Sequence, residues 1–387
     1  MTIFSRLSVV KLTLLGTGTL FLSIAFLAFK DISYLVSFMK AAEQDKRIVT
    51  LVSAAERVAH HHAVERGLTA GYLGNPSADA KQRVLAQRKV ADGAFDSLLK
   101  LANEAWPENL GINNILMPLI NLHKEKERIR SKVDNLNGAE AFSFYSKLNK
   151  SALDVANAFT ILVNDQNAKQ QLLQGLTLAH LKERLGQRRG KINAVLARRT
   201  ISPSVSDEIK SYSSDITYLS DRLELGLDAM MKSRFLNSKK NASSQRVESI
   251  ASEVVQPDVR LSTFPESNEW FKLATEQIGQ VASILEEIFA AIKLNADSRA
   301  SAASTSLFTI IFVIVTVALF IALIYRVLFG VITNQLSLLV ENLNKIAQKG
   351  DLTIDVSMDT KNELGDISRS VNTTILALRD LIRGLGQ

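Results

Sequence analysis

Two long uncharged apolar runs constrain the fold of this chain more than any other feature of its sequence. The first covers Leu12–Phe29, and the second covers Ala300–Tyr325, with its most apolar part at residues 307–325. A helix that crosses the hydrocarbon core of a bilayer needs about 20 predominantly apolar residues. Both runs approach or reach this length, so the sequence predicts two transmembrane helices, at residues 12–29 and 307–325.

Basic residues beside the two runs predict how the chain crosses the membrane. Arg6 and Lys11 precede the first run, and Arg326 follows the second. Lys and Arg concentrate on the cytoplasmic side of membrane helices. A signal peptide is the alternative for the first run, but the run is long for one and no small-x-small cleavage pattern follows it. We therefore expect a multi-pass protein of the bacterial inner (cytoplasmic) membrane, with a cytoplasmic N-terminus (1–11), a periplasmic sensory domain (30–306) and a cytoplasmic C-terminal domain (326–387).

Helical periodicity runs through almost the whole segment 30–306. Apolar residues recur at helical spacing, and no stretch shows the alternation of a strand. The chain has only 6 prolines and 18 glycines, which favours long helices. Antiparallel helices joined by short loops pack as bundles, so we predict an all-α protein. The first and last helices of this domain are expected to be continuous with the two apolar runs. The predicted breaks are residues 74–79, 106–111, 135–140, 199–206, 237–244 and 256–267.

Charge and composition exclude several classes of function. The formal net charge of +7 suits nucleic acid, an anionic membrane or an anionic ligand. Most basic residues lie in the segment predicted to be periplasmic, so we expect the lipid bilayer and no nucleic acid among the partners. The absence of cysteine excludes disulfides and thiol chemistry. The sequence has no nucleophile–base pairing, phosphate-binding loop or cofactor motif, so we expect neither enzymatic activity nor a cofactor.

A short Arg-Gly motif occurs twice in the predicted periplasmic domain. The segment "ERGLTAGYL" (65–73) resembles "RRGKINAVL" (188–196). An internal repeat of this kind predicts two similar four-helix bundles, each with an Arg-Gly at an equivalent height. The aligned residues are Arg66 with Arg189 and Gly67 with Gly190.

The residue types of this motif suit the binding of a small anion. Arginine carries five donors in a planar fork, and two forks that face each other, Arg66 and Arg189, would bind a small planar oxyanion. Glycine inside a helix costs about 1 kcal/mol relative to alanine. We therefore expect Gly67, Gly71 and Gly190 to leave room for close packing beside the arginines. The alternative is that both arginines are solvated or paired with carboxylates.

Three further basic residues are weaker candidates for the same site. Arg184 and Arg188 share one face of a helix at i, i+4, and His62 lies one turn before Arg66. A solvated face, or for His62 the edge of the core, is the alternative. The run His60–His62 does not predict a metal site, because successive residues of a helix point about 100° apart, and we expect no metal.

The two Arg-Gly segments carry a family resemblance. "HHAVERGLTAGYLG" (61–74) and "LKERLGQRRGKINAVLA" (181–197) resemble the two signature segments of the nitrate- and nitrite-sensing (NIT) domain. The resemblance implies two four-helix bundles that bind nitrate or nitrite through arginines, here Arg66 and Arg189. Glu183 and Gly186 also fit the second segment. The family usually has an acidic residue where this chain has Arg188, which leaves the identity of the anion open.

The segment after the second apolar run predicts a parallel coiled coil. Two apolar stripes with a seven-residue repeat flank the connector "KGDLTIDVSMD" (349–359), and a homodimer would bury both stripes. The segment resembles a HAMP domain, which relays helix motion from a receptor to an output. Glu363 and Gly365 match the signature of that family. The stripes are Leu336, Leu339, Leu343 and Ile346, and then Leu364, Ile367, Val371, Leu378 and Leu381.

Together these features predict a dimeric transmembrane sensor for a small oxyanion, expected to be nitrate or nitrite. The architecture resembles a methyl-accepting chemotaxis receptor that stops at Gln387, before its signalling hairpin. We therefore expect either a missing output domain or separate cytoplasmic signalling partners. Two alternatives stay open: a receptor for another anionic metabolite, and a membrane-anchored helical adaptor with no small ligand.

Overall fold

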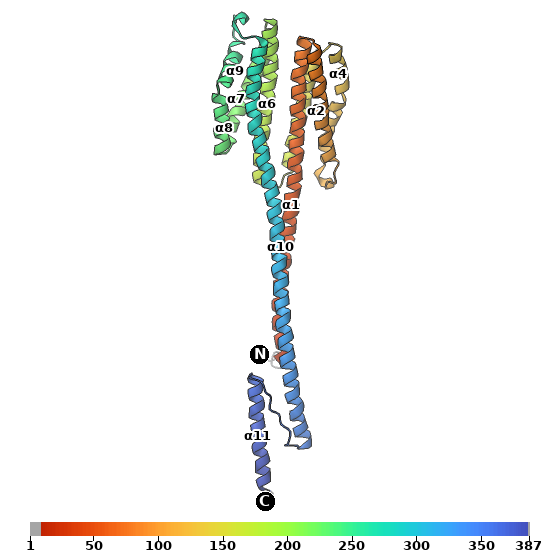
Figure 1. Cartoon of the computed structure of the whole chain (residues 1–387), viewed down its shortest axis with the longest axis vertical. Coiled ribbons are helices and arrows are strands. Elements are labelled where there is room, and N and C mark those ends of the chain that lie inside the picture. Colours follow the sequence, from red (N-terminus) through yellow and green to blue (C-terminus); the bar gives the residue numbers. More distant parts are fainter. Residues whose placement is uncertain (1–8, 386–387) are drawn as a thin grey trace. The chain divides into compact units, whose positions relative to one another are not determined.

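The computed structural model describes residues 9–385, and no strand is present among them (Figure 1). The all-α prediction is confirmed for these residues. Arg6 and most of the predicted N-terminal segment 1–11 lie outside them. The helices are α1 (Val9–Gly74), α2 (Ala78–Ala102), α3 (Ile112–Lys124), α4 (Lys126–Asp134), α5 (Ala141–Ile161), α6 (Gln166–Arg198), α7 (Pro203–Gly226), α8 (Ala229–Lys240), α9 (Ala242–Glu253), α10 (Ser267–Lys349) and α11 (Glu363–Leu385), with short 3-10 helices at Glu108–Leu110 and Leu261–Thr263.

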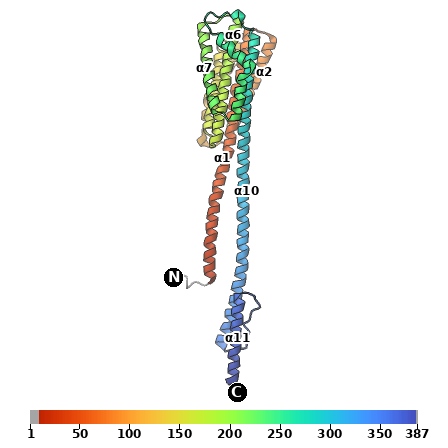
Figure 2. The same ribbon diagram turned by 90° about the vertical axis from the view of Figure 1, so that its left-hand side faces the viewer.

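The chain divides into two compact units. Residues 38–303 form one unit, and the segments on either side of them form the other. Helices α1 and α10 contribute to both units, and Figures 1 and 2 show each as a single uninterrupted helix. The expectation that the first and last helices of the domain continue into the apolar runs is therefore confirmed.

Residues 38–303 fold into two four-helix bundles. Figure 1 shows α1, α2 and α4 grouped on one side and α6, α7, α8 and α9 on the other. In the first bundle α3 and α4 together form one broken helix, and α5 packs against both. In the second bundle α8 and α9 form the broken helix, and α10 is the fourth member. The same order of long, long, broken and long helix in each bundle matches the internal repeat that the sequence predicted.

Side-chain caps explain where several of these helices begin. In each case a side-chain oxygen accepts a hydrogen bond, of 2.8–3.3 Å, from the backbone N–H three residues later. Such a cap satisfies one of the backbone donors that the first turn of a helix leaves free. Two of these caps lie in predicted breaks, at residues 74–79 and 199–206, whereas the helix starts at Asp165 and Asp228 fall at breaks that were not predicted. The capping residues are Ser77 for α2, Asp165 for α6, Ser202 for α7 and Asp228 for α8.

Two hydrophobic cores fill this unit. The larger core combines residues of both bundles, and the smaller one is built mainly by α6, α7, α9 and α10. Along α6 the larger core ends at Leu185 and the smaller core begins at Ile192. Arg188 and Arg189 lie between these two positions. The Arg-Gly motif of α6 therefore forms a polar segment between two apolar cores.

Two helices are long and apolar enough to cross a membrane, judged by length and composition. The most apolar window has a mean hydropathy of 1.6 in α1 and 3.2 in α10, and no residue of either window is buried. Large side chains such as Phe26 and Phe320 lie exposed on these helices. An apolar helix surface of this kind suits contact with lipid rather than with water.

The surroundings of Gly365, at the start of α11, explain the glycine of the predicted signature. A Cβ atom at Gly365 would clash with the carbonyl oxygen of Thr360, so the connector can approach α11 closely only at a glycine. The side chain of Asn362 accepts a hydrogen bond from the Gly365 N–H at 3.1 Å. A small core of Leu339, Val356 and Ile375 joins the end of α10, the connector and α11.

Part of the second heptad stripe remains exposed on α11. Val371 packs against the small core of this unit, but Ile367, Leu378 and Leu381 are 49%, 49% and 61% exposed. A row of large apolar side chains on a helix surface favours contact with another helix. This exposed row is the structural counterpart of the coiled-coil prediction.

Candidate functional site

Arg66 of α1 and Arg189 of α6 lie beside each other across the two bundles. A Cβ atom added at Gly67 would be 3.2 Å from Nη2 of Arg189, and one added at Gly186 would be 3.2 Å from Nη2 of Arg66. Each arginine therefore lies over a glycine of the opposite helix. The glycines leave room for the guanidinium groups, which is the role that the sequence predicted for Gly67.

Arg66 is 3% exposed, and both of its terminal nitrogens donate hydrogen bonds. Its Nη1 donates to Glu183 Oε1 at 2.5 Å and to Ser146 Oγ at 2.9 Å, while its Nη2 donates to Glu183 Oε2 at 3.2 Å. The guanidinium also lies over the ring of Phe142. Two parallel bonds between a guanidinium and a carboxylate are among the strongest polar contacts in proteins. The contact with Glu183 therefore joins α1 to α6.

Arg189 has far fewer partners, although it is mostly buried. Its Nη1 donates to Thr275 Oγ1 at 2.8 Å, and its guanidinium lies 4.4 Å from the ring centroid of Phe271. Its Nε is buried with no hydrogen-bond partner. Within residues 9–385 no carboxylate forms an ion pair with it. Burial, and then the positive charge of Arg66, lower the pKa of Arg189 to about 10, so it remains charged at neutral pH.

The charges around the two arginines do not balance. Glu183 is the one carboxylate that contacts the arginine pair among the described residues, and it also accepts bonds from Asn149 at 3.1 Å and Gln187 at 2.8 Å. Two guanidinium charges therefore face one carboxylate. This arrangement leaves one positive charge without a counterion among the described residues, on a side chain that is only partly exposed.

A groove gives solvent access to this region. Phe142, Ser146 and Glu183, which all contact Arg66, also line the groove. The groove continues past Lys191 and Tyr212. The groove therefore reaches Glu183, the carboxylate that pairs with Arg66.

The two other predicted arginines have carboxylate partners of their own, although Arg184 lines the same groove as Glu183. Arg188 is 2% exposed, and its two terminal nitrogens donate to the carboxylate of Glu248 of α9 at 2.8 and 2.5 Å. The two residues therefore form an ion pair within the second bundle. Arg184 pairs with Asp215 at 2.9 Å near the surface. The structure does not bring either arginine into the pair formed by Arg66 and Arg189.

Two predicted glycines have different surroundings from those expected. A Cβ atom at Gly190 would lie 2.9 Å from the ring of Phe142, so Gly190 accommodates that ring rather than an arginine. Gly71 has no atom within 4 Å of the position of a Cβ, so the packing role predicted for it is not found. Gly186 provides the space that Arg66 needs instead. In the sequence, Gly186 stands out only as a match to the family pattern.

His62 belongs to a separate buried polar cluster in the first bundle. Glu65, three residues further along α1, is fully buried. It accepts two hydrogen bonds of 2.8 Å from Arg130 and one of 2.6 Å from the hydroxyl of Tyr145. Burial and the Glu65 carboxylate raise the pKa of Tyr145. Burial lowers the pKa of His62, and lowers that of His123 to about 3. Both imidazoles are therefore neutral, and His62 is not part of the arginine pair.

Comparisons with known proteins agree with this architecture. Residues 57–293 match the family model described as nitrate and nitrite sensing, and residues 327–380 match that of the HAMP domain. The first match covers more than half of the chain, so the protein belongs to the nitrate- and nitrite-sensing family. A sensory domain, a HAMP domain and two helices able to span a membrane together define a transmembrane signalling receptor, and neither domain is a catalytic one.

Among solved structures, one titled "Structure of the NasR transcription antiterminator" is similar to this chain. The TM-score is 0.57 and the sequence identity 15%, over 90% of this chain and 98% of the other. At this identity the likeness shows the fold alone. A search of curated proteins gives no match.

Three single substitutions test the packing of the glycines. Gly71→Ala should raise the thermal stability of the full chain in detergent by up to about 1 kcal/mol, because alanine favours the helix and nothing opposes its Cβ. Gly67→Ala should gain less, since its Cβ must displace the Arg189 guanidinium. Gly186→Ala should be the least stable of the three, because Glu183 holds Arg66 in place.

Thermal melting followed by circular dichroism gives this order directly. Gly71→Ala is the matched control, since it makes the same chemical change on α1 without a close neighbour. Equal stability of all three variants would show that the glycines are not needed for the arginine packing.

Proposed function

We propose that this protein is a receptor of the bacterial inner membrane that binds nitrate or nitrite between Arg66 and Arg189 of a periplasmic domain. The observation that carries the proposal is Arg189, a mostly buried guanidinium beside a second one, with no ion pair of its own among the described residues. A buried charge without a counterion is costly. A bound anion would supply the missing negative charge.

The charge and shape of the site favour a small monovalent oxyanion. Arg66 and Arg189 together with Glu183 leave a single excess positive charge, which one monovalent anion neutralises. A planar oxyanion accepts paired hydrogen bonds from a guanidinium fork. The glycines at 67 and 186 let the two guanidinium groups lie close to the opposite helix, so both charges can act on one small ion. Nitrate and nitrite meet both conditions of charge and shape.

The contacts of Arg189 suggest how binding reaches the membrane. Thr275 and Phe271, which contact its guanidinium, and Trp270, whose Nε1 donates to its carbonyl oxygen at 3.0 Å, all belong to α10. Helix α10 runs without interruption to Lys349, inside the segment that matches the HAMP domain. An anion that repositions Arg189 therefore acts on the helix that enters HAMP, and small shifts of packed helices are a common means of signalling.

Assembly and orientation complete the proposal. The exposed apolar row of α11, at Ile367, Leu378 and Leu381, would be buried in a parallel homodimer. Lys11 and Arg326 flank the apolar segments, and these positive charges support a cytoplasmic location for the segments that carry them. The output is then a cytoplasmic signalling domain or partner that responds to HAMP.

Removal of either arginine fork should abolish tight binding of the anion. Arg189→Ala loses about two charge-assisted hydrogen bonds, so affinity for nitrate should fall by roughly 3 kcal/mol, which is more than a hundredfold. Arg66→Ala removes the second positive charge beside the anion and should also weaken binding strongly, because Glu183 then neutralises Arg189 instead. Lysine should restore little, because it lacks the planar fork. The measurement is calorimetric titration of the full chain in detergent with nitrate and with nitrite.

The matched control is Arg198→Ala, which removes an exposed arginine from the same helix as Arg189. This variant should bind nitrate like the parent. Unchanged binding by both Arg66→Ala and Arg189→Ala would contradict the proposed site. Binding of some other anion in place of nitrate and nitrite, lost in the same variants, would retain the site and change its ligand.

Glu183 should set the preference of the site for monovalent anions. Glu183→Gln keeps hydrogen-bonding atoms at the same place but raises the excess charge of the site from one to two. The variant should therefore bind sulfate more tightly relative to nitrate than the parent does, by about tenfold for a difference of 1.4 kcal/mol. Competition titrations of nitrate against sulfate measure this ratio, and an unchanged ratio would show that Glu183 plays no part in selectivity.

The dimer proposal is tested by cross-linking in membranes. A cysteine at Leu378, on the exposed apolar row, should form a disulfide between two copies under mild oxidation, since the parent has no cysteine. A cysteine at Asp380, which points to another side of α11, is the matched control and should react slowly. Equal cross-linking at both positions would indicate random collision rather than a coiled coil.

A further inference from the structure

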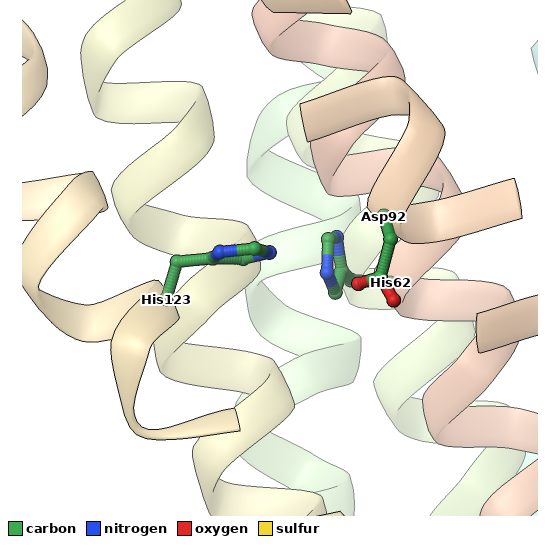
Figure 3. A group of neighbouring side chains, drawn as sticks. All are labelled: His62, Asp92 and His123. Atoms are coloured by element: carbon green, nitrogen blue, oxygen red, sulfur yellow. The ribbon is translucent and has the colours of Figure 1, made fainter. Parts of the chain in front are cut away.

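A second candidate site lies in the first bundle, away from the arginine pair. His62 of α1, Asp92 of α2 and His123 of α3 each offer one ligand atom, and these three atoms all lie within 4.8 Å of one another. Figure 3 shows the two imidazoles and the carboxylate approaching a common point from three different helices. We propose that this cluster binds a divalent transition-metal ion, with Zn²⁺ as the best fit, through two imidazoles and one carboxylate.

The hydrogen bond made by His62 leaves its other nitrogen suited to a metal. His62 is fully buried, and its Nδ1 lies 2.8 Å from the carbonyl oxygen of Val58. A carbonyl oxygen only accepts, so Nδ1 carries the proton and Nε2 carries a lone pair. Metal-binding histidines are commonly oriented by such a bond from the second ring nitrogen. The Nε2 atom of His62 has no partner in the structure.

His123, on the other side of the cluster, also has a ring nitrogen without a hydrogen-bond partner. It is 5% exposed, and its Nε2 is also buried without a hydrogen-bond partner. Its ring stacks on Phe95 at 3.5 Å between centroids and meets the ring of His62 edge to face, at 5.4 Å. These contacts therefore keep both rings close to the cluster. Two buried imidazole nitrogens without partners, side by side, are unusual, because buried polar atoms nearly always have a hydrogen-bond partner.

Asp92 supplies the negatively charged ligand and lies where an ion can enter the cluster from solvent. Its carboxylate accepts bonds from Arg130 at 2.8 and 3.0 Å and lies 3.1 Å from the ammonium of Lys126. Its side chain is 34% exposed, so an ion can enter from solvent at this edge of the bundle. Lys126 is also 3.8 Å from Glu127, so its flexible side chain can move to that carboxylate when a cation binds Asp92.

The net charge of the side chains around the cluster is compatible with a bound cation. Arg130 is matched by the fully buried Glu65, and Arg88 pairs with Asp134 at 3.0 Å. The cluster and its neighbours hold four carboxylates and three basic side chains, which leaves one negative charge before a metal binds. These groups are Glu65, Asp92, Glu127 and Asp134, with Arg88, Lys126 and Arg130.

The ligand set and spacing favour zinc. Zn²⁺ binds histidine nitrogen and carboxylate oxygen at about 2.0–2.2 Å in tetrahedral geometry, with a fourth position open to water. Two ligand atoms of one such ion lie about 3.4 Å apart, so small side-chain rotations close the site. The ion would link α1, α2 and α3, one helical turn before Arg66. The sequence could not show this, because His62 meets ligands that come from other helices rather than from its neighbours in the His60–His62 run.

The test uses the full chain in detergent, purified with an affinity tag that contains no histidine and stripped with a chelator. Titration with ZnCl₂ should show one ion per chain and a rise in melting temperature. Cobalt(II), used as a visible probe, should give the absorption of a four-coordinate ion. X-ray absorption of the zinc-loaded parent should show two imidazole ligands, and this measurement does not depend on any variant folding.

His62→Gln and His123→Gln should each weaken zinc binding by more than a hundredfold, and Asp92→Asn by more than tenfold. The controls are His61→Gln, one residue away on α1, and His180→Gln on α6, whose Nε2 pairs with Asn157 at 3.1 Å. Both controls should bind zinc like the parent. Zinc binding that disappears in His61→Gln, or that is no tighter in the parent than in His62→Gln, would overturn the proposal. A signal from fewer than two imidazoles would overturn it as well.

Discussion

The paired hydrogen bonds between Arg66 and Glu183 determine how the rest of this sensory domain is arranged. Arg66 is almost fully buried, and a guanidinium in that position is stable only beside a carboxylate. Because the two residues belong to α1 and α6, the bond fixes the height at which the two bundles meet. Gly186 makes that height possible, since a side chain there would press against Arg66. The same register brings Arg189 to Arg66 and creates the excess positive charge.

Neighbouring arginines of α6 have different roles because successive residues of a helix point in different directions. Arg188 faces into the second bundle, where Glu248 neutralises it. Arg189 faces the first bundle and α10, where it meets an arginine, a hydroxyl and an aromatic ring. One arginine therefore contributes to the stability of a bundle, while the other has no carboxylate partner among the described residues. Its contacts with Phe271 and Thr275 put the proposed anion site next to the helix that continues into the HAMP domain.

Much of the fold was predictable because it depends on local pattern. Helical spacing of apolar residues, breaks with capping residues such as Ser202 and the heptad stripes near Leu339 are all visible along the chain. The pairing of Arg66 with Arg189 was predictable from the repeat. The roles of Gly71 and Arg188 were not, because they depend on which side of a helix meets a neighbour. Gly71 has nothing beside it, and Arg188 has a carboxylate from a helix 60 residues later in the chain.

The sequence by itself determined that this protein is helical, that two of its segments suit a membrane, and that two arginine–glycine motifs recur in equivalent helices. Periodicity and composition carry this information because each depends on residues close together in the chain. Only the tertiary structure decided that Glu183 neutralises Arg66 but not Arg189, and that His62 meets Asp92 and His123. These contacts join different helices, and their distances depend on how the helices pack rather than on their spacing in the sequence.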